Sequence, residues 1–201
     1  MKYLEKLSLA LIVSTALGGC VTQQSVVSDA GWQSLIKGGS GLENFNRVAE
    51  ANWATRDGAI EASAGGKDAA YLVTTRPYGN FMIKSEFWAS DDVNSGIFIR
   101  CADATKIAAD TCYEVNIYDQ RPDPTYGTGA IVGVAKVDPM PKAGGKWNTL
   151  EITAQGSHLV VVFNGKKTVD AQDSKHDAGY IGLQWGAVGT IRFRSLQIKP
   201  L

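Results

Sequence analysis

The sequence has no excess of charge of either sign, since its 201 residues include 20 Lys and Arg against 20 Asp and Glu. Proteins that bind nucleic acids need a basic surface for the phosphates, so this balance argues against nucleic acid as a partner. Reactive side chains are also scarce, with only two histidines and three cysteines. The chain contains no Gly-rich phosphate loop, no His-Glu-x-x-His zinc helix and no Gly-x-Ser-x-Gly nucleophile elbow. The motifs of these enzyme classes are therefore absent.

Sustained helical periodicity is missing as well. After the first thirty residues, apolar and polar residues alternate in short segments separated by Gly, Asn and Asp, which is typical of half-buried antiparallel strands. The expected strands are 53–61, 70–75, 81–89, 96–100, 113–119, 147–154, 159–163, 181–185 and 191–198. Asn164-Gly165 predicts a hairpin turn after one of them. Strands at this spacing predict an all-β jelly-roll sandwich of two antiparallel sheets, with a single domain over 31–201.

The N-terminus has the composition of an export signal. Two lysines, Lys2 and Lys6, precede an apolar run over 7–17, which is too short to span a bilayer and fits a secretory signal. Two glycines then precede Cys20, the position where a lipoprotein carries its diacylglycerol. We expect a lipoprotein signal peptide at 1–19, a lipidated Cys20 and a tether over 20–30, with an ordinary secretory signal as the alternative. Because Val21 rather than Asp follows the cysteine, the expected location in a Gram-negative host is the outer membrane, facing the periplasm.

The other two cysteines, Cys101 and Cys112, lie on either side of a short polar segment. In an exported protein such a pair is expected to form a disulfide. The alternative is a pair of free or metal-binding thiols. A metal site would need companion histidines or cysteines, and the sequence offers none nearby.

Prolines are concentrated in one part of the chain, because four of the six lie between residues 121 and 145. Several glycines accompany them. This composition predicts one or two long loops, and long loops on a rigid sandwich often carry binding groups. A merely irregular connection is the alternative interpretation.

Polar side chains recur at alternating positions of three expected strands. If the apolar residues of these strands face the core, the opposite face presents Glu86, Arg100, Glu114 and Asn116. Carboxylate, guanidinium and amide groups pair with hydroxyls, and aromatic rings cover the apolar side of a sugar. The pattern therefore suggests a carbohydrate site, although ordinary surface polarity with cross-strand ion pairs is the alternative.

The order of motifs along the chain resembles the 3-keto-disaccharide hydrolase family. The segments that carry the resemblance are Gly-Trp-Gln-Ser-Leu at 31–35, Trp-Ala-Thr-Arg-Asp-Gly-Ala-Ile at 53–60, Asn-Ser-Gly-Ile-Phe-Ile-Arg at 94–100, Tyr-Glu-Val-Asn-Ile-Tyr-Asp at 113–119, Thr-Gly-Ala-Ile at 128–131, Trp-Asn-Thr-Leu-Glu-Ile at 147–152 and Phe-Arg-Ser-Leu at 193–196. The resemblance implies a concanavalin A-like jelly roll. It also implies action on a glycoside whose C3 is already a ketone.

The implied chemistry depends on that ketone. A carbonyl at C3 acidifies the C2 proton, so a base can remove it, the C1 substituent can leave, and water can add afterwards. By position and motif, we expect Glu114 to be the base and Arg100 the electrostatic stabiliser. Glu86 or Asp119 would supply a second acid or a ligand for a divalent metal ion. The side chains expected to bind substrate are Asn94, Asn116, Asp119, Gln184 and Trp185.

The chain departs from the family pattern at three positions. A Gln-x-His-Gly segment of the relatives reads Gln184-Trp185-Gly186 here, so a histidine is missing, while Asn116 replaces a Gln and Ser195 replaces an Asn. The sequence therefore leaves two main functions open. One is a hydrolase or lyase for modified glycosides, and the other is a non-catalytic, lectin-like carbohydrate-binding lipoprotein. A structural protein of the cell envelope is a third.

Overall fold

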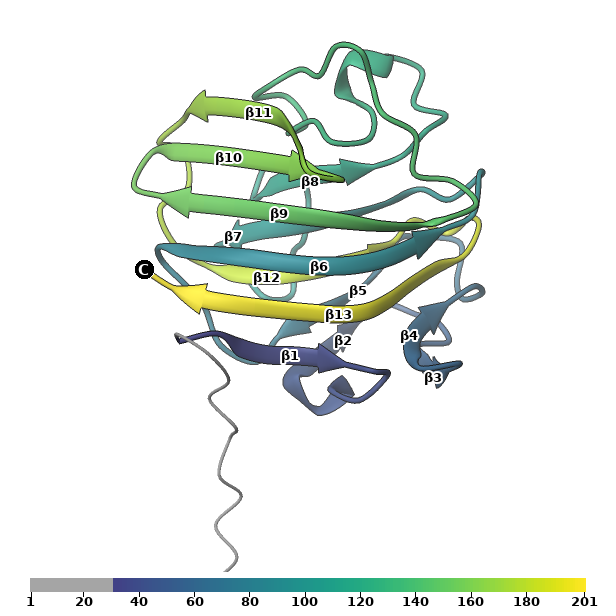
Figure 1. The fold of residues 1–201 in the computed structure, drawn as a ribbon. Coiled ribbons are helices and arrows are strands. Elements are labelled where there is room, and N and C mark those ends of the chain that lie inside the picture. The colour runs from purple at the N-terminus through teal and green to yellow at the C-terminus, as the bar shows by residue number, and fades with distance from the viewer. Residues whose placement is uncertain (1–30) are drawn as a thin grey trace, which may run out of the picture.

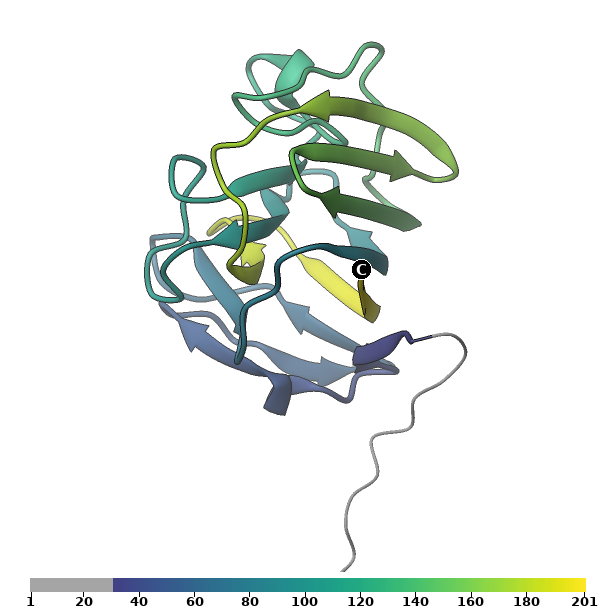
Figure 2. The same ribbon diagram turned by 90° about the vertical axis from the view of Figure 1, so that its left-hand side faces the viewer.

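A computed structural model describes residues 31–201 as two antiparallel β-sheets packed face to face (Figures 1 and 2). The expected signal peptide, the lipidation site at Cys20 and the tether lie outside the described residues. Within the described part of the chain, no helix has the length and apolar character needed to cross a membrane.

The larger sheet has eight strands and lies at the front in Figure 1. In spatial order its strands are β11 (Lys166–Gln172), β10 (His158–Phe163), β9 (Trp147–Gln155), β6 (Phe81–Ala89), β13 (Ile191–Pro200), β4 (Ala59–Ala62) and β3 (Ala54–Arg56), with β1 (Gln33–Lys37) also paired to β13.

The smaller sheet has five strands and lies behind the larger one in Figure 1. In spatial order they are β2 (Phe45–Val48), β5 (Ala70–Thr74), β12 (Tyr180–Trp185), β7 (Ser95–Cys101) and β8 (Tyr113–Ile117). Two short 3-10 helices, η1 (Leu42–Asn44) and η2 (Pro124–Tyr126), lie in the connections.

The hydrophobic core fills the space between the two sheets. Phe87 and Phe193 of the larger sheet and Ile97 and Leu183 of the smaller one are fully buried there. Strand β6 alternates as the sequence predicts, because its odd-numbered residues are buried and its even-numbered residues are at least partly exposed. Period-two alternation therefore defines the inner face of the larger sheet.

The sequence-based prediction of an all-β sandwich is confirmed. All the expected strands are present, although 53–61 divides into the hairpin β3–β4. The predicted turn at Asn164-Gly165 joins β10 to β11, and both residues have the positive φ that a type I′ turn requires. Strands β1, β2 and β11 were not predicted. They are short or weakly patterned, and they form by pairing with neighbours distant in sequence or across that hairpin.

The outer face of the smaller sheet is covered by loops. Every residue of β7 and β8 is buried, including the polar ones that alternate with the core residues. The 121–145 segment contains only the short helix η2, and it contributes backbone hydrogen bonds to the outer edge of β8. The predicted long loop is confirmed, and the side chain of Asn116 on β8 donates a hydrogen bond to it, at the carbonyl of Tyr126.

Candidate functional site

A row of four residues crosses the outer face of the smaller sheet. Asn116 on β8 pairs with Gly96 on β7. Gln184 on β12 follows Leu183, the partner of Ile97, and therefore lies beside Gly96. Tyr71 on β5 pairs with Gln184 and completes the row.

Gly96 is the one position in this row without a side chain. A Cβ atom there would lie 3.5 Å from Cγ of Glu114, 3.6 Å from Oε1 of Gln184 and 3.1 Å from the carbonyl oxygen of Val115. Because glycine has no side chain, the carboxylate of Glu114 and the amide of Gln184 approach each other over the β7 backbone. The sheet thus brings an acid and an amide together at one glycine.

Glu114 is the titratable group at the centre of this cluster. Glu114 is 7% exposed, and no hydrogen bond to its carboxylate is found within residues 31–201. Burial raises the pKa of the Glu114 carboxyl to about 7, while the positive charge of the half-buried Arg121 acts to lower it. A carboxylate with this pKa is suited to proton transfer near neutral pH.

Hydrogen-bond acceptors without partners surround the same position. The amide nitrogen of Gln184 donates to the Tyr71 hydroxyl at 3.4 Å, but its oxygen has no partner. Asn116 donates to the carbonyl of Tyr126 at 2.7 Å, and its amide oxygen is also unpaired. Buried polar atoms are normally paired, so unpaired acceptors beside a carboxylate favour a ligand rich in hydroxyl donors.

Tyr71 supplies a hydroxyl to the cluster. Burial raises the pKa of Tyr71, the hydrogen bond from Gln184 lowers it, and the nearby charge of Glu114 raises it again. The phenol therefore stays protonated at neutral pH and can donate a hydrogen bond to a ligand. Tyr71 was not singled out from the sequence, because its position beside Gln184 depends on the pairing of β5 with β12.

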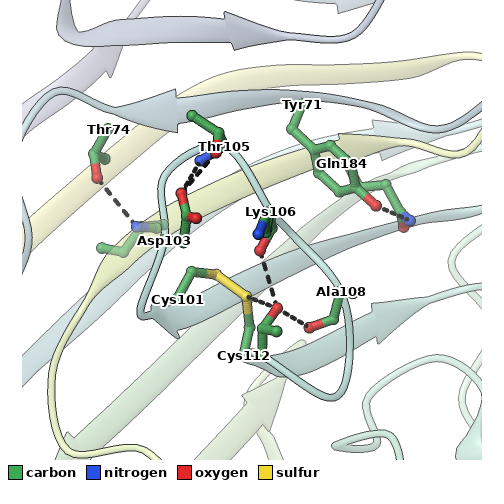
Figure 3. The surroundings of a disulfide bond; sticks show 11 residues. Tyr71, Thr74, Cys101, Asp103, Thr105, Lys106, Ala108, Cys112 and Gln184 are labelled. Carbon is green, nitrogen blue, oxygen red and sulfur yellow. Dashed lines mark hydrogen bonds between the residues drawn. A yellow bond between two sulfur atoms is a disulfide. The ribbon is translucent and has the colours of Figure 1, made fainter.

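The predicted disulfide between Cys101 and Cys112 is present. The segment that it closes folds over the outer face of the smaller sheet, as Figure 3 shows together with Tyr71 and Gln184. Ile107 of this segment fills the space above Gly182, where it packs with Phe98 in a second apolar cluster. The space above Gly182 is thus filled by apolar atoms, whereas the space above Gly96 is bordered by the polar side chains of Glu114 and Gln184.

Arg100 does not join Glu114, contrary to the expectation from alternation. Two residues of β7, Ile99 and Arg100, lie opposite the single residue Ile181, so the strand contains a bulge. Arg100 has a φ of 53° at this bulge. The bulge breaks the period of two, so Arg100 leaves the face that Phe98 occupies.

The guanidinium of Arg100 instead connects loops at one end of the sandwich. It donates to the carbonyl oxygens of Gly79, Gly156 and His176 and to Oδ1 of Asn80, at 2.7 to 3.2 Å. The side chain is fully buried, and burial lowers its pKa. These contacts indicate a structural role.

Glu86 is also separated from Glu114. It lies on the outer face of β6 in the larger sheet, where it forms an ion pair with Arg194 at 3.1 Å. The whole core lies between its sheet and that of Glu114. The prediction that the two carboxylates share a patch is therefore wrong, because alternation defines a face of a strand but not the sheet to which the strand belongs.

The remaining predicted binding residues have structural partners. Asp119 accepts hydrogen bonds from the Thr128 hydroxyl and from the backbone of Ala143 and Gly144, and so holds the long loop. Trp185 points into the core, and its indole donates to the carbonyl of Gly189 at 3.0 Å. Asn94 packs against Gly186 next to the row. Only Glu114, Asn116 and Gln184 of the predicted set come together.

A divalent metal ion does not fit these side chains. Within residues 31–201 no three His, Cys, Asp or Glu side chains gather as metal ligands do. Of the two side chains expected as ligands, the Glu86 carboxylate is paired with Arg194, and the Asp119 carboxylate already accepts hydrogen bonds from three donors. We therefore assign no step to a metal.

A large cavity lies elsewhere. It has a volume of about 950 Å³ and runs beside β1 on the larger sheet, with Glu86 but not Glu114 in its lining. We centre the candidate catalytic site on Glu114, because the raised pKa and the unpaired amides are found there and not in the cavity.

Comparison with solved structures gives the same fold. The crystal structure of a "Putative glycosyl hydrolase" from Parabacteroides distasonis is 25% identical, with a TM-score of 0.69 over 86% of this chain and 100% of that one. A second from the same organism is 17% identical, with a TM-score of 0.72 over 85% and 94%. The carbohydrate-binding module CBM66 from Bacillus subtilis is 16% identical, with a TM-score of 0.60 over 84% and 95%. A search of curated proteins finds no match.

Sequence comparison at the level of families is more specific. The model of the 3-keto-alpha-glucoside-1,2-lyase-like domain matches residues 31–199, which include both sheets and the row around Gly96. The match covers nearly all of the described chain. The protein therefore belongs to the family of 3-keto-alpha-glucoside-1,2-lyase-like domains.

Proposed function

We propose that this domain cleaves 3-keto-glycosides by elimination, with Glu114 as the general base. Membership of the family supports the substrate class. The observation that carries the role of Glu114 is its buried carboxylate with a pKa raised to about 7, beside the unpaired amide oxygen of Gln184. A base is most effective when its pKa lies near the working pH.

The proposed reaction begins at C2 of the oxidised sugar. The Glu114 carboxylate removes the C2 proton, and the electron pair of that bond moves toward the C3 carbonyl to give an enolate. Return of the pair forms a C1–C2 double bond and breaks the C1–O bond, and the departing oxygen takes up the proton that Glu114 removed from C2, so that the aglycone leaves as an alcohol and the carboxylate is restored. Water then adds across the double bond, so the net reaction is hydrolysis.

Two groups near Glu114 are suited to the charge that develops. The Tyr71 hydroxyl can donate to the enolate oxygen, and Arg121 supplies a positive charge at longer range. Arg100 has no part in this step, because its guanidinium is bound to loop carbonyls. The amide oxygens of Gln184 and Asn116 are suited to receive sugar hydroxyls.

The test is release of free sugar from a 3-keto-glucoside or 3-keto-trehalose by the purified protein. We expect Glu114→Gln to reduce release at least 100-fold, since general-base catalysis contributes about 10² to 10⁴. Glu86→Gln is the matched control and should retain activity, because its carboxylate lies on the other sheet. Wild-type activity in Glu114→Gln would contradict the proposal.

A second candidate is a carbohydrate-binding domain without catalysis. Two observations favour it: the chain reads Gln184-Trp185-Gly186, without the histidine that the resemblance implies in this segment, and the fold is shared with a carbohydrate-binding module. Binding of the keto-sugar without release of the aglycone, in wild type and in Glu114→Gln alike, would support this function instead.

We also propose that the domain is held to a membrane through a lipid on Cys20, on the outer membrane in a Gram-negative host. The apolar run and the two glycines before that cysteine support this proposal. Intact mass of the exported protein tests it. A Cys20→Ala variant should lose the acyl mass and appear in the soluble fraction.

A further inference from the structure

A second site is suggested by the cavity on the larger sheet. This cavity, about 950 Å³ in volume, runs along β1 and is also lined by β6, β9, β13 and the segment 75–78. These four strands lie side by side at the front of Figure 1, on the sheet that does not contain Glu114. Its volume is at the upper end of the range of small-molecule sites. We call it the β1 groove.

The β1 groove is lined by groups that suit a hydroxyl-rich ligand. Hydroxyls and amides are the most frequent, and those on its strands are Gln33, Ser34, Ser85, Thr149, Ser195 and Gln197. Such groups both donate and accept hydrogen bonds, as a sugar hydroxyl does. The lining therefore matches a polyhydroxyl compound better than an apolar one.

Charges in the groove are nearly balanced. Lys37, Arg76 and Lys84 oppose Glu86 and Glu151. Glu86 also binds Arg194, which lies outside the lining, through both of its carboxylate oxygens at 3.1 Å. Two of the three basic groups already have partners, since Arg76 donates to the Tyr78 hydroxyl and Lys84 lies over the Trp32 ring, so the lining offers no free basic cluster for an anionic ligand.

Trp32 adds an aromatic surface to the groove. The ammonium of Lys84 lies 5.1 Å from the centroid of its ring, a cation–π contact that holds the indole in place. Arg76 is likewise held, because its Nε donates to the Tyr78 hydroxyl at 3.1 Å and its guanidinium also binds Gln33. A fixed aromatic ring beside fixed polar groups is suited to one face of a pyranose.

We propose that the β1 groove binds a neutral oligosaccharide without chemical change, at a site separate from that of Glu114. The proposal does not depend on the proposed elimination reaction. It predicts that the domain holds a glycan chain on the larger sheet, while the site around Glu114 lies on the smaller sheet.

Nuclear magnetic resonance of the tryptophan indoles provides a direct test, with maltotetraose and cellotetraose as probes. At about 10 mM sugar, which saturates a site with a Kd near 1 mM, we expect the Trp32 indole signal to shift. The signals of Trp53 and Trp185 serve as internal controls, because both side chains are almost fully buried. A Trp32 signal that moves with neither sugar would overturn the proposal.

Substitutions in the β1 groove test whether the sugar binds there. Trp32→Ala should weaken sugar binding at least tenfold without loss of the β-sheet circular dichroism spectrum, and Lys84→Met should weaken it several-fold. Trp147→Ala is the matched control, since this tryptophan is exposed on the same sheet but does not line the groove.

Glu114→Gln distinguishes the two proposals from each other. It should bind the tetrasaccharides as wild type does, whatever its effect on 3-keto-glucoside cleavage. Loss of tetrasaccharide binding in Glu114→Gln, or equal affinity in Trp32→Ala and wild type, would show that the β1 groove is not the binding site.

Discussion

The side chains of Glu114 on β8 and Gln184 on β12 approach each other above Gly96, which lies on β7, the strand between them. A methyl group added to Gly96 would lie 3.5 Å from Cγ of Glu114 and 3.6 Å from Oε1 of Gln184. The same methyl would lie 3.1 Å from a backbone carbonyl of β8. The proposed site therefore depends on the absence of one side chain as much as on the two that are present.

Gly96→Ala should lower the rate of sugar release at least tenfold. The added methyl occupies the space between the acid and the amide, while the strand φ of Gly96 is tolerated by alanine. Steady-state kinetics with a 3-keto-glucoside measures the effect. Gly79→Ala is the control, because a Cβ there meets no atom within 4 Å; equal losses in both variants would contradict the role of Gly96.

The rate of cleavage should rise with pH through about 7. Glu114 acts as a base only when ionised, and burial raises its pKa to about 7. Below that pH we expect the rate to fall about tenfold for each unit, as for a single essential base. A profile of kcat/KM between pH 5 and 9 checks this, and a rate independent of pH below 7 would exclude Glu114 as the base.

Glu114 should also make the protein less stable as pH rises from about 4.5 to about 7. Its pKa in the folded state is raised above the ordinary value of 4.5, so the folded state binds more protons in this range and the free energy of unfolding falls with pH. The loss is on the order of 3 kcal/mol when the pKa difference is converted. Urea unfolding at pH 5 and pH 8 measures it.

Glu114→Gln should remove most of this dependence and be more stable than wild type at pH 8. Glu86→Gln serves as control and should keep the wild-type dependence. If Glu114→Gln and wild type lose stability in parallel between the two pH values, burial of the Glu114 charge is not the cause.

Arg100→Ala should destabilise the fold by more than about 3 kcal/mol. It removes a buried guanidinium and leaves three carbonyl oxygens without their donor, and an unpaired buried group costs about 1 to 3 kcal/mol. Arg194→Ala removes an exposed ion pair with Glu86 and a cation–π contact with Trp147, and it should cost only about 1 kcal/mol. Urea midpoints of the two variants compare them; similar midpoints would refute the structural role of Arg100.

Replacing both Cys101 and Cys112 with Ser should lower the free energy of unfolding by about 3 kcal/mol. The disulfide joins two cysteines that are 11 residues apart in the sequence, and the loop-closure entropy of such a loop gives a value of this size. Wild type in reducing agent should match the variant. A variant as stable as the oxidised wild type would show that the apolar packing of Ile107 alone holds the segment on the sheet.

Much of the fold was predictable because strand patterning is local. The alternation in β6 and β8 indicated which residues face the core, and Glu114 and Asn116 lie away from it as expected. The site was only partly predictable. A glycine inside a strand signals close approach of other groups, so Gly96 could have been found, whereas nothing near Tyr71 in the sequence indicates its neighbour Gln184.

The sequence alone determined the class of fold, the disulfide pair and the side of its strand on which Glu114 lies, because each follows from period-two patterning or from residue type. The tertiary structure decided the rest. Strand order assigned Glu86 and Glu114 to different sheets, and a bulge turned Arg100 toward the loops. Both depend on pairings between segments far apart in the chain, which local patterning does not specify.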